Sequence, residues 1–210
     1  MKLALLGATG ATGKLLLEQA LAAGHEVVAY ARNPADLAGT RAQVIQGDAN
    51  DSAAMQRLVG GAQAVLSALG SRTLKKNTVR SDAMKNLLAA MKGGVAKKLV
   101  WLSASGVGDS AEQARRSSII FGRIFMPLVL KHVYADAAVA DGLLRASDLS
   151  WVCARPVGLT NKPLTGKSSV LLDGSKIPKL TISRADVARF MLEAATTSKY
   201  DRTAPVLYGP

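Results

Sequence analysis

Short apolar runs alternate along the chain with longer segments whose apolar positions repeat every three to four residues. The apolar runs predict strands over residues 3–6, 26–31, 43–46, 64–69, 98–102 and 150–154, with a short terminal strand over 205–208. The periodic segments predict helices over residues 14–23, 53–59, 78–92, 129–144 and 187–197. This alternation is typical of a parallel sheet covered by helices on both faces.

A glycine-rich turn joins the first predicted strand to the first predicted helix. The stretch Leu3–Gly13 reads LALLGATGATG. Gly7 lets the chain leave the strand with an unrestricted φ, Gly10 presents no Cβ to an approaching pyrophosphate, and Gly13 lets the helix pack closely on its strand. The free N–H groups and the positive dipole end of that helix then attract phosphate. The first gap is one residue longer than in the usual dinucleotide fingerprint, and a turn that binds nothing is the alternative.

This unit, together with the alternation that follows it, predicts a Rossmann fold. We expect an α/β protein with a doubly wound, mostly parallel sheet and the strand order 3-2-1-4-5-6, followed by a seventh strand. No repeat, linker or compositional break divides the chain, so residues 1–210 are predicted to form one NAD(P)-binding domain. A small region on the substrate side is expected from residues 106–134 and 157–180.

The end of the second predicted strand indicates which nicotinamide cofactor the turn would bind. An NAD site usually places an acidic residue about 20 residues beyond the glycines, where it binds the ribose 2′-hydroxyl. Arg32 stands at that strand end instead. A guanidinium pairs with a 2′-phosphate through two hydrogen bonds and stacks on adenine. We therefore predict NADP(H), with a merely solvated arginine as the alternative.

Two further strand ends complete the predicted cofactor site. Asp48 either accepts a hydrogen bond from the adenine amino group or forms a turn. The small Gly70 leaves room for the nicotinamide ribose, with contacts from the backbone of residues 68–70. The residues expected to contact the cofactor are Gly7, Thr9, Gly10, Ala11, Thr12, Gly13, Arg32, Asp48, Ala49, Ala68, Leu69, Gly70, Ser103 and Pro156.

Polar residues near the fifth predicted strand are the candidates for chemistry. Ser103 and Ser105 follow this strand, at the edge of a parallel sheet where ligands bind. A serine hydroxyl there could hold a carbonyl substrate, although both hydroxyls could equally cap loop backbone. Tyr134 is the third candidate, and the neighbouring His132 is read as structural rather than as a ligand contact. No metal site is predicted.

The predicted helical region from residue 112 to residue 145 is interrupted by Pro127. Its apolar stretch, residues 118–126, lies beside several arginines. A substrate lid, a dimer face and a membrane-surface contact are all compatible with this pattern, and core packing is its commonest cause.

Charge and cysteine content restrict the partners and the compartment. Lysine and arginine number 27 against 15 acidic residues, which gives a net charge of +12. The basic residues are scattered and form no nucleic-acid recognition pattern, so an anionic cofactor and a solvated basic surface are favoured over specific nucleic-acid binding. The single cysteine, Cys153, fits a reducing compartment. Because no apolar run is long enough for a membrane span, we predict a cytoplasmic protein. We expect a monomer or a homodimer.

Several segments in this order resemble the atypical short-chain dehydrogenase/reductase family, in its NAD(P)H-binding group of NmrA-like and biliverdin/flavin reductase-like proteins. The segments that carry the resemblance are Leu5–Gly13, Tyr30–Asn33, Gly47-Asp48, Lys98–Ser103, Leu149–Pro156 and Ile182–Ala188. Many members transfer hydride with the help of a tyrosine and a lysine four residues later. Here Ala138 stands four residues after Tyr134, so that proton relay is absent.

The resemblance implies an NADPH-dependent oxidoreductase that transfers hydride to a small, planar acceptor such as a flavin or quinone. Such transfer requires mainly close stacking of nicotinamide and acceptor, because solvent can supply the proton. A non-catalytic NADP-binding sensor or regulator of the NmrA-like type is the alternative. A nucleotide-sugar epimerase or dehydratase is disfavoured by the missing relay.

Overall fold

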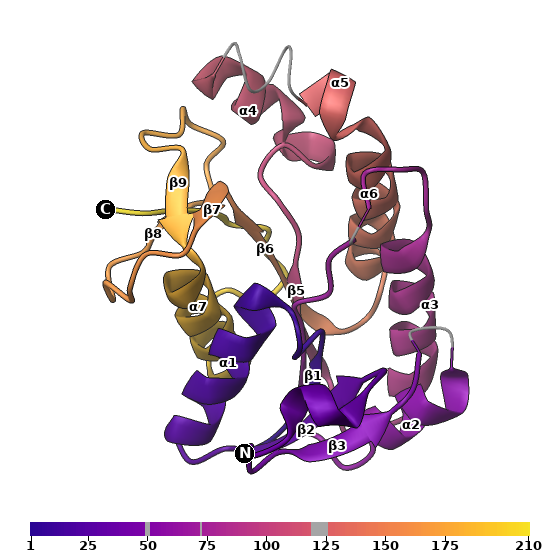
Figure 1. Cartoon of the computed structure of the whole chain (residues 1–210). Coiled ribbons are helices and arrows are strands. Elements are labelled where there is room, and N and C mark those ends of the chain that lie inside the picture. Colours follow the sequence, from indigo (N-terminus) through magenta and orange to yellow (C-terminus); the bar gives the residue numbers. More distant parts are fainter. Residues whose placement is uncertain (49–50, 72, 119–125) are drawn as a thin grey trace.

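The computed structural model describes residues 1–48, 51–71, 73–118 and 126–210 (Figure 1). Two of the sequence predictions therefore lie wholly or mostly outside the described residues. These are the cofactor contact at Ala49 and the role of the apolar stretch 118–126.

The strands form one large sheet and one small sheet. The strands are β1 (Lys2–Leu6), β2 (Glu26–Ala31), β3 (Gln43–Gln46), β4 (Ala64–Ser67), β5 (Lys98–Leu102), β6 (Ser150–Pro156), β7 (Gly158–Thr160), β8 (Ser169–Leu171), β9 (Thr181–Ser183) and β10 (Val206–Tyr208). The large sheet has the order β3-β2-β1-β4-β5-β6-β10-β8. Its pairs are parallel except for the edge pair β10–β8. The predicted order is confirmed, and β10 takes the seventh place.

The helices follow the predicted alternation. They are α1 (Ala11–Ala22), α2 (Ser52–Val59), α3 (Val79–Met91), α4 (Ala111–Ser117), α5 (Met126–Val129), α6 (Lys131–Arg145) and α7 (Arg184–Thr196), with 3-10 turns η1 (Pro34–Leu37) and η2 (Gly108–Ser110). The helical region that the sequence predicts to be interrupted at Pro127 is described as α4, α5 and α6, with Pro127 in the first turn of α5. In the described part of the chain, no helix is both long and apolar enough to cross a membrane.

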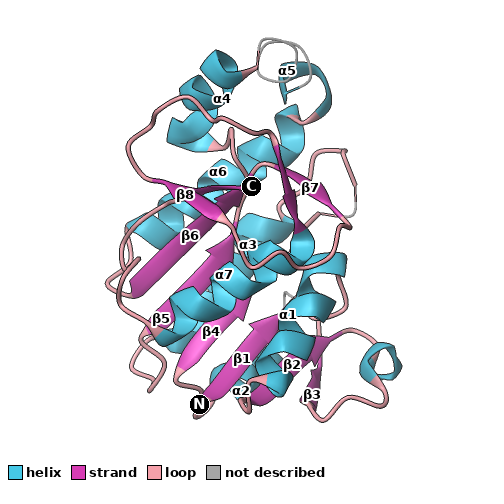
Figure 2. Ribbon diagram, turned by 90° about the vertical axis from the view of Figure 1, so that its left-hand side faces the viewer, coloured by secondary structure: helices cyan, strands magenta, loops and turns pink. Residues whose placement is uncertain are grey.

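The sheet is buried on both faces. Along β1, Leu3 and Leu5 belong to one apolar cluster, whereas Ala4 and Leu6 belong to the other. Successive side chains of a strand point to opposite faces, so an unbroken apolar run such as this one requires cover on both sides. Helices α1 and α7 lie across one face, and α2, α3 and α6 cover the other (Figures 1 and 2).

Side-chain oxygens fix where three helices begin. Asp51 accepts a hydrogen bond from the N–H of Ala54 at the start of α2, and Ser183 accepts one from the N–H of Asp186 at the start of α7. The first N–H groups of α3 are capped by a side chain of another helix. Asp136 on α6 accepts hydrogen bonds from the N–H groups of Arg80 and Ser81, at 2.9 and 3.1 Å. This buried carboxylate therefore joins α3 to α6.

Candidate functional site

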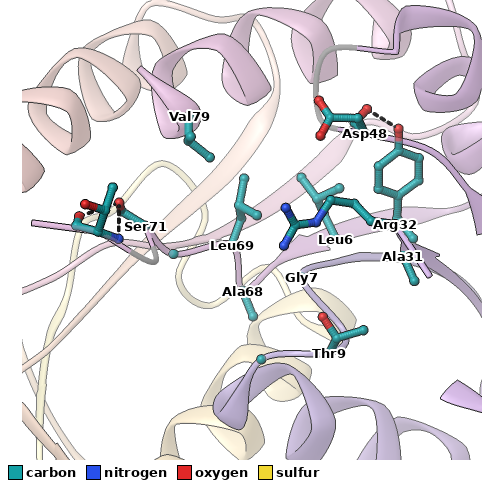
Figure 3. Close-up of a pocket in the computed structure, with 14 residues that line it drawn as sticks. Leu6, Gly7, Thr9, Ala31, Arg32, Asp48, Ala68, Leu69, Ser71 and Val79 are labelled. Carbon is teal, nitrogen blue, oxygen red and sulfur yellow. Dashed lines mark hydrogen bonds between the residues drawn. The ribbon is translucent and has the colours of Figure 1, made fainter. Parts of the chain in front are cut away.

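A pocket of about 290 Å³ opens where β1, β2 and β4 end (Figure 3). Its lining comes from the glycine turn, the ends of β2 and β3, the segment after β4 and the first residue of α3. The lining residues are Leu6, Gly7, Thr9, Gly10, Tyr30, Ala31, Arg32, Asp48, Ala68, Leu69, Gly70, Ser71, Thr73 and Val79. The carboxyl edge of an open parallel sheet is where such folds bind ligands.

Close backbone packing shapes the glycine turn. Gly7 has a φ of +82°, and a Cβ on it would lie 2.7 Å from the carbonyl carbon of Ala68. A Cβ on Gly13 would overlap the carbonyl oxygen of Gly7. Only glycine fits these two positions, as the sequence predicts. The turn therefore brings β1, α1 and the end of β4 together.

The surface at Gly10 is open, in contrast to its two neighbours in the motif. A Cβ there would meet only the Gly7 oxygen, at 3.4 Å. Gly10 is also the N-cap of α1, where no side chain caps the helix and the first turn has no acidic residue. The first N–H groups of α1 thus have no competing side-chain acceptor at the cap, which suits a bound diphosphate. The turn therefore fits a dinucleotide cofactor.

The ends of β2 and β3 form the opposite wall. The Arg32 side chain extends from the end of β2 into the pocket (Figure 3). It is exposed, and within the described residues its guanidinium makes no hydrogen bond or ion pair. Beside it, the Tyr30 hydroxyl donates a hydrogen bond to the backbone oxygen of Asp48. Burial raises the pKa of Tyr30 to about 12, so this phenol stays protonated and holds β2 to the turn after β3.

The predicted cofactor residues divide into two groups in the structure. Those that line the pocket are Gly7, Thr9, Gly10, Arg32, Asp48, Ala68, Leu69 and Gly70. Those outside its lining are Ala11, Thr12, Gly13, Ser103 and Pro156, and Ala49 lies outside the described residues. Their contacts with a cofactor all stay predictions.

Sequence reasoning missed part of the pocket lining. The missed residues are Leu6, Tyr30, Ala31, Ser71, Thr73 and Val79. Leu6, Tyr30 and Ala31 occupy the last positions of β1 and β2, so the strand ends already contained a signal for them. Ser71, Thr73 and Val79 lie beyond the predicted contacts at residues 68–70, and no pattern in the sequence placed them at the pocket.

The three candidate catalytic residues lie near the ends of β5 and α6 and make internal hydrogen bonds. The buried Ser103 hydroxyl donates to Asp141 on α6, with 2.9 Å between the oxygens. The Tyr134 hydroxyl donates to the backbone oxygen of Ser105, at 3.1 Å. Burial raises the pKa of Tyr134 to about 12. The phenol of Tyr134 therefore keeps its proton near neutral pH.

Ion pairs connect Asp141, the hydrogen-bond partner of Ser103, to the protein surface. Arg155, which is 3% exposed, pairs with the buried Asp141 at 3.2 Å and with Asp109 at 2.7 Å. Arg145 also pairs with Asp109, at 2.8 Å. Burial opposes the charge on Asp109, but Arg155 and Arg145 outweigh it and hold the pKa of that carboxyl below its usual range. We call Ser103, Asp141, Arg155, Asp109 and Arg145 the polar network.

The fold and the pocket together define a class of protein, the Rossmann-fold proteins that bind a nicotinamide dinucleotide. A family model described as NAD(P)H-binding matches residues 7–198. The chain belongs to this NAD(P)H-binding family.

Two curated relatives are similar in sequence. An uncharacterised protein of Mycobacterium tuberculosis is 31% identical over 157 residues, which cover 66% of this chain. The chain spans only 18% of that protein's length. An oxidoreductase of Pestalotiopsis microspora is 28% identical over 220 residues, covering 94% of this chain and 81% of the relative.

Solved structures share the fold over the whole chain. The anaerobilin reductase ChuY of Escherichia coli O157:H7 has a TM-score of 0.82 at 24% identity, with 100% of this chain and 98% of that chain covered. A short-chain dehydrogenase/reductase of Veillonella parvula, solved in complex with NADP, has a TM-score of 0.81 at 18% identity, with 100% and 94% covered. The family match confirms the NAD(P)H-binding part of the resemblance seen in the sequence, and the neighbours confirm its fold.

Proposed function

We propose that this protein is an NADPH-dependent reductase that transfers hydride to a small, planar acceptor such as a flavin or quinone. The observation that carries the proposal is Arg32, whose unpaired guanidinium extends into the pocket from the end of β2. An acid at this strand end would favour the 2′-hydroxyl of NAD, whereas a guanidinium favours the 2′-phosphate of NADP. The NADP complex of the Veillonella parvula neighbour supports the same choice.

The residues of the pocket would divide the binding work. The N–H groups at the start of α1 bind the diphosphate, and Arg32 binds the 2′-phosphate. The backbone of residues 68–70 borders the nicotinamide ribose. When bound, NADPH would supply the hydride, with its two electrons, that reduces the acceptor, and solvent would supply the balancing proton.

Ser103, Ser105 and Tyr134 would shape the acceptor side rather than relay a proton. Tyr134 already donates its phenolic hydrogen to the Ser105 carbonyl, and Ser103 donates its own to Asp141. Both contacts hold the segment after β5 against α6. Hydride transfer then depends on how closely nicotinamide and acceptor stack.

The same hydrogen bonds favour a second candidate function, a non-catalytic NADP-binding sensor. A chain that has lost the relay can still bind NADP and report its level to a partner. Turnover of NADPH with a panel of flavins and quinones separates the two functions. Tight NADPH binding without turnover on any member of the panel would favour the sensor.

The decisive test of cofactor choice is Arg32→Glu. We expect the Kd for NADPH to rise about tenfold or more, because charge-assisted hydrogen bonds to the 2′-phosphate are lost, while the Kd for NADH changes little. Arg41→Glu makes the same change of charge just before β3, away from the pocket, and should leave both affinities unchanged. Fluorescence titration measures both. Equal NADPH affinity in the wild type and Arg32→Glu would refute the 2′-phosphate assignment.

A further inference from the structure

A second hollow lies next to the cofactor pocket, on the other part of the same loop. Thr73 and Val79 line the cofactor pocket, and Leu74, Lys75 and Lys76, which lie between them in the chain, line this hollow. Its lining residues are Leu74, Lys75, Lys76, Leu128, Val129 and His132. We call it the lysine groove. It lies between the segment after β4 and the region where α5 meets α6.

The apolar side chains of the lysine groove are unusually exposed. Leu74 is 55% exposed and Leu128 78% exposed. Leucine side chains gathered at a hollow next to a ligand pocket are a feature of binding surfaces, because leaving them in water costs free energy. These walls fit an apolar ligand surface.

The loop that carries the two lysines is held in shape by its own side chains. The Asn77 side-chain amide donates to the Lys75 backbone oxygen at 2.7 Å and to the Ser71 hydroxyl at 3.1 Å. The Lys75 N–H donates to the Thr73 hydroxyl at 3.1 Å. The groove wall is therefore organised before any ligand arrives, which reduces the entropy cost of binding.

The ammonium groups of the two groove lysines pair with no acidic side chain among the described residues. Within the described residues, Lys75 and Lys76 make no side-chain hydrogen bond or ion pair. No acidic residue occurs in the sequence over residues 70–81 or 126–135. Asp136, the next acid along α6, is buried and accepts hydrogen bonds from the start of α3. An apolar hollow with two unpaired cations is complementary to a ligand that is apolar and negatively charged.

We propose that the lysine groove binds the carboxylate-bearing end of the acceptor. The planar reacting part of the acceptor then reaches the nicotinamide across the segment after β4, which contributes residues to both the groove and the cofactor pocket. The inference rests on the proposed reductase function. It narrows the acceptor class to planar molecules that carry a carboxylate on an apolar body.

A carboxylate fits this groove better than a phosphate. Phosphate sites in proteins typically add backbone N–H groups or the fork of an arginine to a lysine. Among the described residues, the lining of the groove has no arginine and combines apolar walls with lysine ammonium groups, which act as point charges on apolar stems. A singly charged carboxylate attached to an aromatic body satisfies both features.

Binding of a matched pair of probes tests this proposal without any need for turnover. Anthraquinone-2-carboxylate and its neutral methyl ester are titrated calorimetrically into the protein, with and without NADP. We expect the acid to bind about tenfold more tightly than the ester, since two exposed cations contribute about threefold each. Added salt should weaken binding of the acid only.

Two variants locate the effect. Lys75→Met together with Lys76→Met should remove the preference for the acid and leave the ester unchanged. Leu128→Gln, at a side chain that folding does not bury, should weaken both probes. Lys92→Met together with Lys97→Met removes the same charge beyond α3 and just before β5, outside the groove, and should change neither affinity.

The outcomes are distinct. Equal affinities for acid and ester, no binding of either, or a full acid preference in the Lys75/Lys76 variant would overturn the proposal. A lysine-dependent preference for flavin mononucleotide over riboflavin that exceeds the acid preference would also overturn it, in favour of a phosphate. Failure of the proposed function would appear elsewhere, as unchanged NADPH affinity in Arg32→Glu.

Discussion

The cofactor pocket and the polar network lie at the same edge of the sheet but are built in opposite ways. The pocket is shaped mainly by backbone, with glycines at 7 and 13 that allow close packing and a side chain, Arg32, whose guanidinium makes no hydrogen bond or ion pair with the residues that the structure describes. The polar network consists of charged side chains that are paired with one another, from the buried Asp141 and Arg155 to the more exposed Arg145 and Asp109. The pocket therefore has hydrogen-bond donors that can bind a ligand, whereas most charged groups of the network already bind one another.

This difference assigns different tasks to the two regions. A site made of open N–H groups and an unpaired guanidinium binds an anion at little structural cost. A buried chain of ion pairs holds neighbouring elements in place, because losing one member leaves the next charge unpaired. Changes in the network should therefore affect stability most, and changes at the open surface of the pocket should affect binding most.

The largest effect is expected from Asp141→Ala. The substitution removes the buried partner of Arg155 and the acceptor of the Ser103 hydroxyl. Leaving a buried charge without its partner costs about 3–5 kcal/mol of unfolding free energy, with Asp109 compensating only in part. Urea denaturation followed by circular dichroism measures it.

Ser103→Ala is the matched control, because it removes one hydrogen bond to the same carboxylate and no charge. It should cost only about 1 kcal/mol. If the two variants lose the same stability, the network is not held together by its charges and the contrast with the pocket is wrong.

The next effect in size is that of Gly7→Ala. Alanine at Gly7 would combine a positive φ with a Cβ at 2.7 Å from the Ala68 carbonyl carbon. We expect a loss of roughly 2–3 kcal/mol in thermal unfolding experiments. Gly24 has a similar φ of +78° but nothing within 4 Å of its Cβ position, so Gly24→Ala should cost only about 1 kcal/mol. Equal losses would mean that the close approach to β4 does not constrain the turn.

Gly10→Ala should separate binding from stability. Its Cβ would meet only the Gly7 oxygen at 3.4 Å, so the fold should tolerate it. A methyl group over the first N–H groups of α1 would keep a diphosphate away, and we expect about a tenfold loss in NADPH affinity, equivalent to about 1.4 kcal/mol. Gly142→Ala on α6 also has open space and should leave NADPH affinity unchanged. NADPH affinity that survives in Gly10→Ala would place the diphosphate elsewhere.

The sequence predicts the pocket better than the network for a physical reason. A glycine turn between a strand and a helix is a local pattern, and Gly7, Gly13 and Arg32 lie within or next to predicted elements. The strand order follows from the same local alternation. The end of β4 is predicted less well, because this strand ends at Ser67 rather than at residue 69, whereas the interruption of the helical region near Pro127 is predicted.

The sequence does not indicate which side chains far apart in the chain bind one another. Ser103 and Asp141 are far apart in the chain, and only the packing of α6 on the sheet brings them together. The same holds for Asp136, whose carboxylate caps a helix from another element. The lysine groove also depends on such packing, because Lys75 and His132 come from different parts of the fold.

The smallest effect concerns pH and again distinguishes the network from the pocket. The pKa of Asp109 is lowered in the folded protein, where Arg155 and Arg145 outweigh the cost of burial. Its contribution to stability is therefore complete above its unfolded pKa of about 4 and is lost as the pH falls through the lower folded value. The Asp109 side chain is 59% exposed, so water screens its ion pairs and keeps the effect small.

Asp109→Asn tests this dependence. The unfolding free energy of the wild type should fall more steeply between pH 5 and 2 than that of the variant, as measured by urea denaturation at a series of pH values. The variant should be less stable at pH 7, and the difference between the two proteins should shrink as Asp109 becomes protonated. Two parallel curves would mean that Asp109 has the same pKa in the folded and unfolded protein, so that the ion pairs at the surface end of the network contribute nothing. The network would then consist of its buried members alone, because Arg155 would be held by Asp141 without help from the surface.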